Sequence, residues 1–422
     1  MLQNPFYLFF TACLGLFFWA GYRRIFAEVP YRHSLWSFLG EECAQGQRRA
    51  IVRALLAGLP GDSGAMAWIL TMAALCLGGA GALFWYLVFS LLWLHPLGAL
   101  AGLWRYYQPG CGGRVELSAL LEGMLCRKRA RARPGLGRLL RWLQTLALCG
   151  MLPLLFRILA SPSAPARGAG LLPWLVVLLA LWLLCRLVGE RGETVLSLLF
   201  LLLLAAALLG NLPNLIPAVK LVLLDAFDRS RFLFSLSGAG LAAALQAGGA
   251  AGCGGALLRT LSAREEGPSF AHPAQAAFYE ELRGLLQLTV QLALGLLFLC
   301  ARRVPEDNRW PQTCLWAFLC LFGLLWLGRA VRALARPEGR RCGLLCFGLV
   351  GAAAVWDIWK GTALLPGLSG GAAGLASLAL AGLLLFDSNW YFLLLEHYRD
   401  VHIWHVTPHP DLMQTEMERK NM

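Results

Sequence analysis

The sequence predicts an all-α polytopic membrane protein with about eleven transmembrane helices, and three observations support this fold class. Of the 422 residues, 58% are hydrophobic and only 14% are charged, whereas about a quarter of the residues of a soluble domain are charged. Apolar runs long enough to cross a bilayer, about 20 residues each, recur along the chain. Many of the 16 tryptophans lie near the ends of these runs, as is typical of residues at the membrane interface.

The apolar runs define the expected spans, with an error of about four residues at each boundary. The first run has no basic residue before it and is followed by two arginines. This is the reverse of a secretory signal, so we expect a retained helix. The expected spans are 5–22, 51–73, 78–104, 139–160, 170–188, 194–212, 243–263, 284–302, 313–334, 342–359 and 370–396.

The distribution of Lys and Arg predicts the orientation. Loops after odd-numbered spans, together with the C-terminal tail, hold roughly three times as many of these residues as loops after even-numbered spans. Because cytoplasmic loops carry the excess, we expect the N-terminus to lie outside and the C-terminus in the cytoplasm. The expected location is a bacterial inner (plasma) membrane. The net charge of +13 then reflects topology and attraction to anionic lipid. No basic–aromatic module indicates nucleic-acid binding.

The second span is interrupted by the sequence LAGLPGDSGAMA at 56–67. A proline with Gly61 and Gly64 disrupts the helix beside the polar residues Asp62 and Ser63. A broken helix in lipid is tolerated where its freed backbone groups line a cavity, and an intramembrane Asp is a candidate functional residue because it is costly. The alternative is a simple Pro-Gly kink with Asp62 near the interface.

A second interruption is predicted within 246–275, after a Gly/Ala-rich helix suited to close packing. By hydropathy alone its second half is a cytoplasmic loop, and the alternative is a second broken helix. Two breaks in matching places of two halves are the best sequence indication of a transporter site. The residues around this break are Ser262, Arg264, Glu265, Glu266, Gly267 and His272.

Together the breaks predict a single transmembrane domain over 1–422 that contains two inverted repeats of five helices. Its expected parts are an N-terminal helix at 5–22, a first repeat at 51–212, a surface or re-entrant segment at 213–242, a second repeat at 243–396 and a cytoplasmic tail at 397–422. Within the third part, two prolines predict the end of a span followed by a short amphipathic helix. Glycines at 78–81 predict the close approach of another helix.

Several other classes of site have no support in the sequence. The 13 cysteines are scattered and contain no CxxC pair, so neither zinc nor a disulfide framework is indicated. Histidines in tails are usually incidental, and we expect no metal site at His397, His402, His405 and His409. The chain has no P-loop, HExxH or nucleophile elbow, so we expect no enzyme and no cofactor.

Four segments in order resemble the alanine/glycine:cation symporter family. LGGAGALFW at 77–85 is similar to that family's GGPGA(V/I)FW segment, and IPAVKLVLLDAF at 216–227 to its IPxxxxxIxxxAF segment. LLRTLS and GPSFAH, at 257–262 and 267–272, are similar to parts of RGxFSNEAGxGSAPIAH. GAAAVWDIWKGTALLP at 351–366 is similar to the next-to-last helix.

The resemblance implies the leucine transporter-type fold, with one outer helix before a ten-helix core, and a symporter of a small amino acid such as alanine or glycine. Na⁺ or H⁺ would be the coupling ion. The chain departs from the family where GTGN is replaced by 61–64 and NEAGxG by 263–267. On this basis the expected substrate-binding residues are Gly61, Asp62, Ser63, Gly64, Ser262 and Gly267. The expected ion-coupling residues are Asp62, Glu265 and Glu266.

The altered motifs leave two functions open. Asp62 would repel a substrate carboxylate and would suit an amine or a cation, while buried glutamates can titrate near neutral pH. Loss of the motifs favours instead a degenerate, non-transporting homologue that acts as a membrane scaffold or assembly partner. A polar cavity between spans two and seven would favour transport. A cavity plugged by Met66, Trp68 or Phe270 would favour the scaffold.

Replacing Asp62 with Asn is expected to alter substrate uptake. A charge 4 Å from a bound ion contributes roughly 4 kcal/mol at an effective dielectric of about 20, which is enough to reverse a preference between substrates. Uptake of amino acids and amines by the Asp62→Asn variant measures this effect. Unchanged uptake would count against a role for Asp62.

Overall fold

The computed structural model describes the helical core of the chain. Helix accounts for 96% of the residues placed with confidence, and no strand occurs among them, so the all-α class is confirmed at this level. The described residues are 9, 45–57, 62–107, 142, 145–146, 149, 152–153, 155–156, 190–228, 241–242, 244–249, 251–252, 273–301, 310–334 and 340–360.

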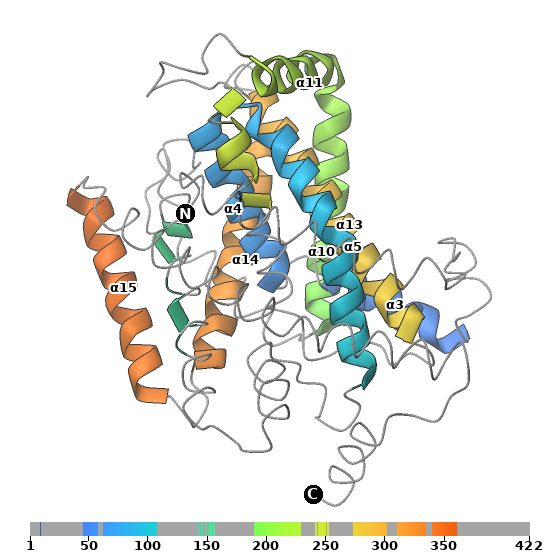
Figure 1. Ribbon diagram of the computed structural model, residues 1–422, viewed down its shortest axis with the longest axis vertical. Helices are drawn as coiled ribbons and strands as arrows, with labels where there is room; N and C mark the ends of the chain where they lie inside the picture. Colours follow the sequence, from blue (N-terminus) through green and yellow to red (C-terminus); the bar gives the residue numbers. More distant parts are fainter. Residues whose placement is uncertain are drawn as a thin grey trace, which may run out of the picture.

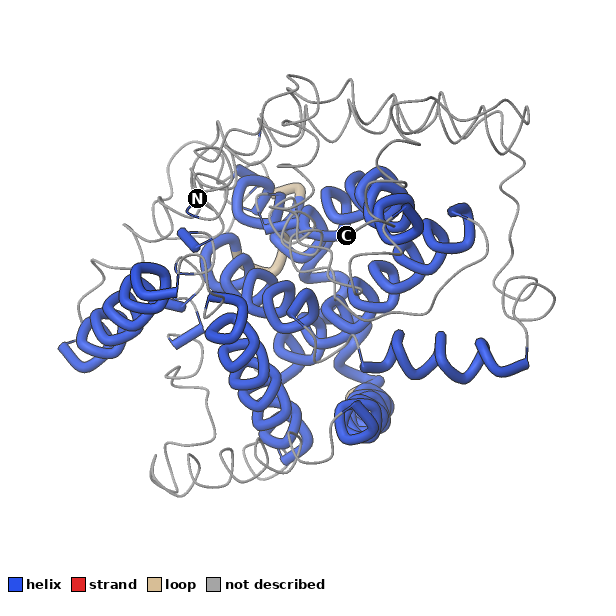
Figure 2. The backbone as a smooth tube through the Cα atoms, turned by 90° about the horizontal axis from the view of Figure 1, so that it is seen from below, coloured by secondary structure: helices blue, strands red, loops and turns tan. Residues whose placement is uncertain are grey.

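The helices with bounds in this part of the chain form a bundle. Figure 1 shows α11 lying across one end of the bundle and α15 standing to one side. Seen from below, most of the helices gather in one group (Figure 2). The bounds are α3 Gln45–Ala57, α4 Asp62–Gly78, α5 Ala82–Tyr107, α10 Glu190–Gly210, α11 Leu212–Ala226, α13 Pro273–Ala301, α14 Trp310–Leu334 and α15 Arg340–Lys360.

One or two membrane spans are recognisable in the described residues by length and composition. The stretch Phe278–Cys300 of α13 is long and apolar enough to cross a bilayer by itself. The stretch Thr194–Gly210 of α10 qualifies together with α11, but the two helices meet at 88°. Within the described residues, α4, α5, α14 and α15 each contain an apolar stretch of 10–17 residues, which is shorter than a span. The count of eleven spans and the five-plus-five repeat stay predictions.

The junction between α10 and α11 has the form that the sequence predicts, with a long apolar helix followed by a short one. The side-chain amide of Asn211 donates to the Ala207 carbonyl at 2.8 Å, which satisfies one free carbonyl at the end of α10. α11 has a proline in its first turn. The backbone N–H groups of a first turn have no acceptor within the helix, so a proline, which has no N–H, costs nothing there. The buried residues of α11 recur every fourth position, at Ala218, Val222 and Ala226.

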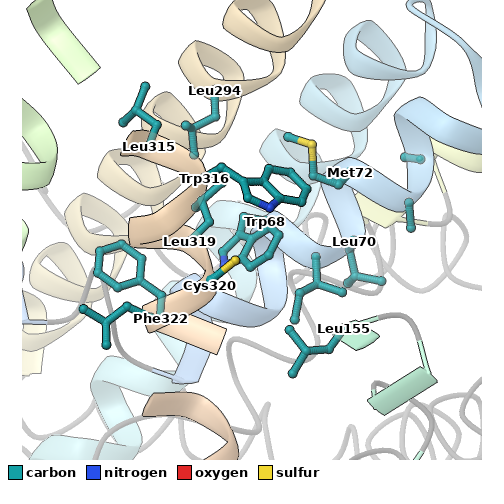
Figure 3. Close-up of a cluster of buried hydrophobic side chains, with 14 of the residues drawn as sticks. Trp68, Leu70, Met72, Leu155, Leu294, Leu315, Trp316, Leu319, Cys320 and Phe322 are labelled. Carbon is teal, nitrogen blue, oxygen red and sulfur yellow. The ribbon is translucent and has the colours of Figure 1, made fainter. Parts of the chain in front are cut away.

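Aromatic side chains from α4, α10 and α14 fill the centre of the bundle. Trp68 and Trp316 pack edge to face with ring centroids 6.4 Å apart (Figure 3). Phe200 and Phe322 pack in the same way at 5.0 Å. Such pairs add about 0.5–1.5 kcal/mol to the effect of burial alone. They fix the relative positions of these three helices.

Glycine residues allow other segments to reach the backbone of α5. A Cβ added to Gly81 would collide with the backbone of Ala226 in α11. A Cβ added to Gly252 would lie 2.8 Å from the Tyr86 carbonyl oxygen, and one added to Gly248 would collide with Ala82. The predicted close packing of both glycine-containing segments is therefore confirmed.

Gly81→Ala is expected to lower the free energy of unfolding by about 1–3 kcal/mol, because the added methyl group has no space against α11. Gly348→Ala is the matched control, since no atom of the described residues lies within 4 Å of a Cβ at Gly348. In a helix interior this second substitution is expected to stabilise the protein by about 1 kcal/mol. Thermal unfolding of the purified protein in detergent measures both. Shifts of the same sign would contradict the packing at Gly81.

Candidate functional site

The structure describes only one edge of the predicted substrate site. Asp62 is the first residue of α4, and Ser63 and Gly64 follow in its first turn. An acidic residue is favourable at this end of a helix because of the helix dipole. Both predicted breaks stay predictions, because the remaining candidates lie outside the described residues: Gly61, Ser262, Glu265, Glu266 and Gly267.

Helices α5 and α13 form a closely packed antiparallel pair. Contacting residue numbers rise along α5 and fall along α13, which defines the direction. A Cβ on Gly98 would lie 2.8 Å from Glu281 Cγ, and a Cβ on Gly295 would lie 2.8 Å from Leu83 Cδ1. Between these levels, Leu94 contacts Gly284 and Tyr86 bonds to Gln291.

A row of polar side chains runs along one face of α13. Its members are three or four residues apart, the spacing that places side chains on one face of a helix. All lie within the membrane-length stretch Phe278–Cys300. We call them the polar face of α13: Glu280, Arg283, Gln287 and Gln291.

The side chains of the polar face are buried, and several of them have polar partners. Gln287 and Gln291 are 3% and 2% exposed, and Arg283 is 5% exposed. Arg283 Nη1 lies 3.4 Å from Glu280 Oε2, and the hydroxyl of Tyr86 donates to Gln291 Oε1. The residues of the polar face were not predicted as site residues from the sequence. Their spacing of three or four residues along an apolar helix is the signal that could have identified them as one face.

A cavity of about 20 Å³ lies beside the polar face. The walls come from α4, α10, α13 and α14. Such a volume admits one water, which needs about 10–15 Å³, and is too small for an amino acid. The residues that line it are Trp68, Phe200, Gln287, Val290, Gln291, Leu294, Leu319 and Phe322.

Trp68 lies between α4 and α14. Its side chain is 2% exposed and packs against Trp316, as Figure 3 shows. This contact joins span two to span nine, so the plug expected between spans two and seven stays a prediction. Of the other two residues considered as plugs, the structure does not describe the side chain of Met66 or any part of Phe270. Among the described residues, no group of three or more His, Cys, Asp or Glu side chains could hold a metal ion.

The first two segments that carry the family resemblance meet where α11 ends on α5. Asp225 Oδ2 accepts a hydrogen bond from the Gly81 backbone N–H at 2.7 Å. Trp85 Nε1 donates to the Ala226 carbonyl at 3.1 Å, and the Trp85 ring packs on Phe227 with centroids 5.8 Å apart. The carboxylate thus caps the start of α5 while the indole caps the end of α11.

Comparison with models of known protein families finds no match, and comparison with curated proteins finds none either. The resemblance therefore rests on the four segments themselves, and the family remains a proposal.

Gln291→Leu is expected to lower the free energy of unfolding by about 1–3 kcal/mol, because it leaves the buried Tyr86 hydroxyl without its acceptor. Tyr86→Phe together with Gln291→Leu removes both polar groups and should cost less than the sum of the single changes. The coupling is expected to be about 0.5–3 kcal/mol. Chemical unfolding of the four proteins in detergent measures this coupling. Simple additivity would contradict the bond.

Proposed function

We propose that the protein is a secondary active transporter, a symporter of the alanine/glycine:cation type that carries a small amino acid or amine with Na⁺ or H⁺. The buried polar face of α13 carries this proposal. Polar and ionisable side chains are costly at membrane depth, and there they face the bundle interior and mark substrate or ion pathways. Gln287 and Gln291 lie well inside the membrane-length stretch of α13 and point away from its exposed side.

The proposed fold is the leucine transporter type, with eleven spans in a bacterial plasma membrane. Two packing relations agree with the predicted order of the spans, and both are the same for either orientation in the membrane. Spans three and eight should cross in opposite directions, and α5 and α13, which correspond to them, are antiparallel. The start of span three and the segment after span six should lie on the same side, and Gly81 bonds to Asp225 there.

Within this proposal, substrate binds near the start of α4 and the polar face lies behind it. α4 packs on both α13 and α14, so the start of α4 and the polar face belong to neighbouring helices. Asp62 favours an ammonium group or a cation over a carboxylate because of its charge. The residues expected from the second break would complete the site from the facing repeat.

The second candidate function is a non-transporting membrane scaffold. It is favoured by the packing of Trp68 on Trp316 and by a cavity that holds one water at most. In a scaffold, this indole pair would be a permanent part of the core.

Transport is tested by uptake of radiolabelled alanine, glycine and serine into proteoliposomes under imposed Na⁺ or proton gradients. We expect uptake above that of empty liposomes for at least one substrate, and a large loss in Gln287→Leu because the polar face is interrupted. Thr289→Val is the matched control. It removes a polar group from the exposed side of the same helix, where the Thr289 hydroxyl only bonds back to the Leu285 carbonyl.

Uptake by Thr289→Val should equal that of the wild type. If the folded wild-type protein takes up none of the three substrates under either gradient, the transporter proposal fails for this substrate class and the scaffold gains support. Equal uptake by Gln287→Leu and the wild type would show that transport does not depend on the polar face.

A further inference from the structure

We propose that the cavity between α4, α10, α13 and α14 is a binding site for one water molecule, held at the inner end of the polar face of α13. Water at this position requires only the packing of these helices, whether or not the protein transports anything. Gln287 and Gln291 give the cavity a polar wall, and Trp68 and Phe200 are among its apolar lining residues.

The size of the cavity admits a single small molecule. Its volume of about 20 Å³ exceeds the 10–15 Å³ that one water needs, approximately. Apolar cavities of similar size stay dry, whereas a cavity is wet when it offers two or more hydrogen-bonding partners. Two carboxamides, 2–3% exposed, supply these partners here.

The chemistry of the walls selects water over an ion. Among the described residues, no Asp or Glu lines the cavity, so a buried cation would have no counter-charge there. No Lys, Arg or His lines the cavity, so a buried anion would be unpaired, which costs several kcal/mol. Water both accepts and donates, as carboxamide neighbours require.

The polar face connects this position to one end of the span. Arg283 lies one helical turn from Gln287, and Gln291 lies one turn further. Gln291 is eight positions beyond Arg283, a distance of about 12 Å along the helix axis. The water therefore sits well inside a hydrocarbon layer about 30 Å thick. It gives α4 and α13 a hydrogen-bonding partner that can be exchanged when the helices move.

X-ray hydroxyl-radical footprinting tests this site on the full-length protein in detergent, because radicals formed from a bound water oxidise the side chains beside it. Two internal comparisons match residue type and burial. Trp68 lines the cavity and Trp93 does not, although they are 2% and 0% exposed. Phe200 lines it and Phe347 does not, at 1% and 5% exposed.

We expect Trp68 and Phe200 to be oxidised several-fold faster than Trp93 and Phe347, and to incorporate ¹⁸O from labelled water. Val290→Ile adds one methyl group at the cavity wall and should reduce oxidation of Trp68 and Phe200 alone. Equal oxidation rates within each pair in the wild-type protein would overturn the proposal. So would a Val290→Ile variant in which Trp68 and Phe200 are oxidised as fast as in the wild type. The buffer anion gives a further test. If Trp68 is oxidised more slowly in chloride than in gluconate, the cavity binds a small anion and the water proposal is overturned.

Discussion

The close approach of other segments to the first half of α5 is the constraint on which the rest of the structure depends. In the bilayer that we propose for this protein, helices would gain little from the hydrophobic effect when they associate, so packing and hydrogen bonds would have to hold them. Gly81, Gly248 and Gly252 each bring a second backbone into contact with this part of α5 or its start. A side chain at any of these positions would force the partner away.

This packing sets the position of the two polar features of the bundle. On one side, α11 is held at the start of α5 by reciprocal caps, in which a carboxylate satisfies an amide and an indole satisfies a carbonyl. On the other side, the antiparallel pairing with α13 places the Tyr86 hydroxyl on Gln291. Both depend on the rotation of α5 about its axis, because Gly81, Trp85 and Tyr86 face their separate partners within little more than one turn.

Much of the helical framework follows from the sequence. Apolar runs predicted α10, α14 and α15 within a few residues, and prolines predicted the short helix α11. Glycine-rich segments predicted close packing. These features are local, since they depend on the length of an apolar run, on a missing N–H or on a missing side chain. Their partners are more than a hundred residues away, and no local pattern identifies them.

The polar face of α13 could not be predicted by hydropathy. The expected span began at 284, which left Glu280 outside the span and Arg283 at its edge, whereas α13 begins at Pro273. The helix continues through these charges because they pair with each other and because Gly98 makes room for the neighbouring Glu281. The packing of Trp68 on Trp316 is also a tertiary property. For the predicted substrate residues, the structure adds only that α4 begins at Asp62.

The antiparallel register of α5 and α13 is the central claim, and cysteine cross-linking in the membrane tests it most directly. Gly98→Cys with Glu281→Cys places two thiols at a contact where the hypothetical Cβ of residue 98 lies 3.3 Å from the Cα of residue 281, close enough for a disulfide. We predict that mass spectrometry finds this linked peptide pair after mild oxidation, and finds no link between Gly98→Cys and Gly295→Cys. Efficient linkage of the second pair, without the first, would contradict the register and with it the buried polar face.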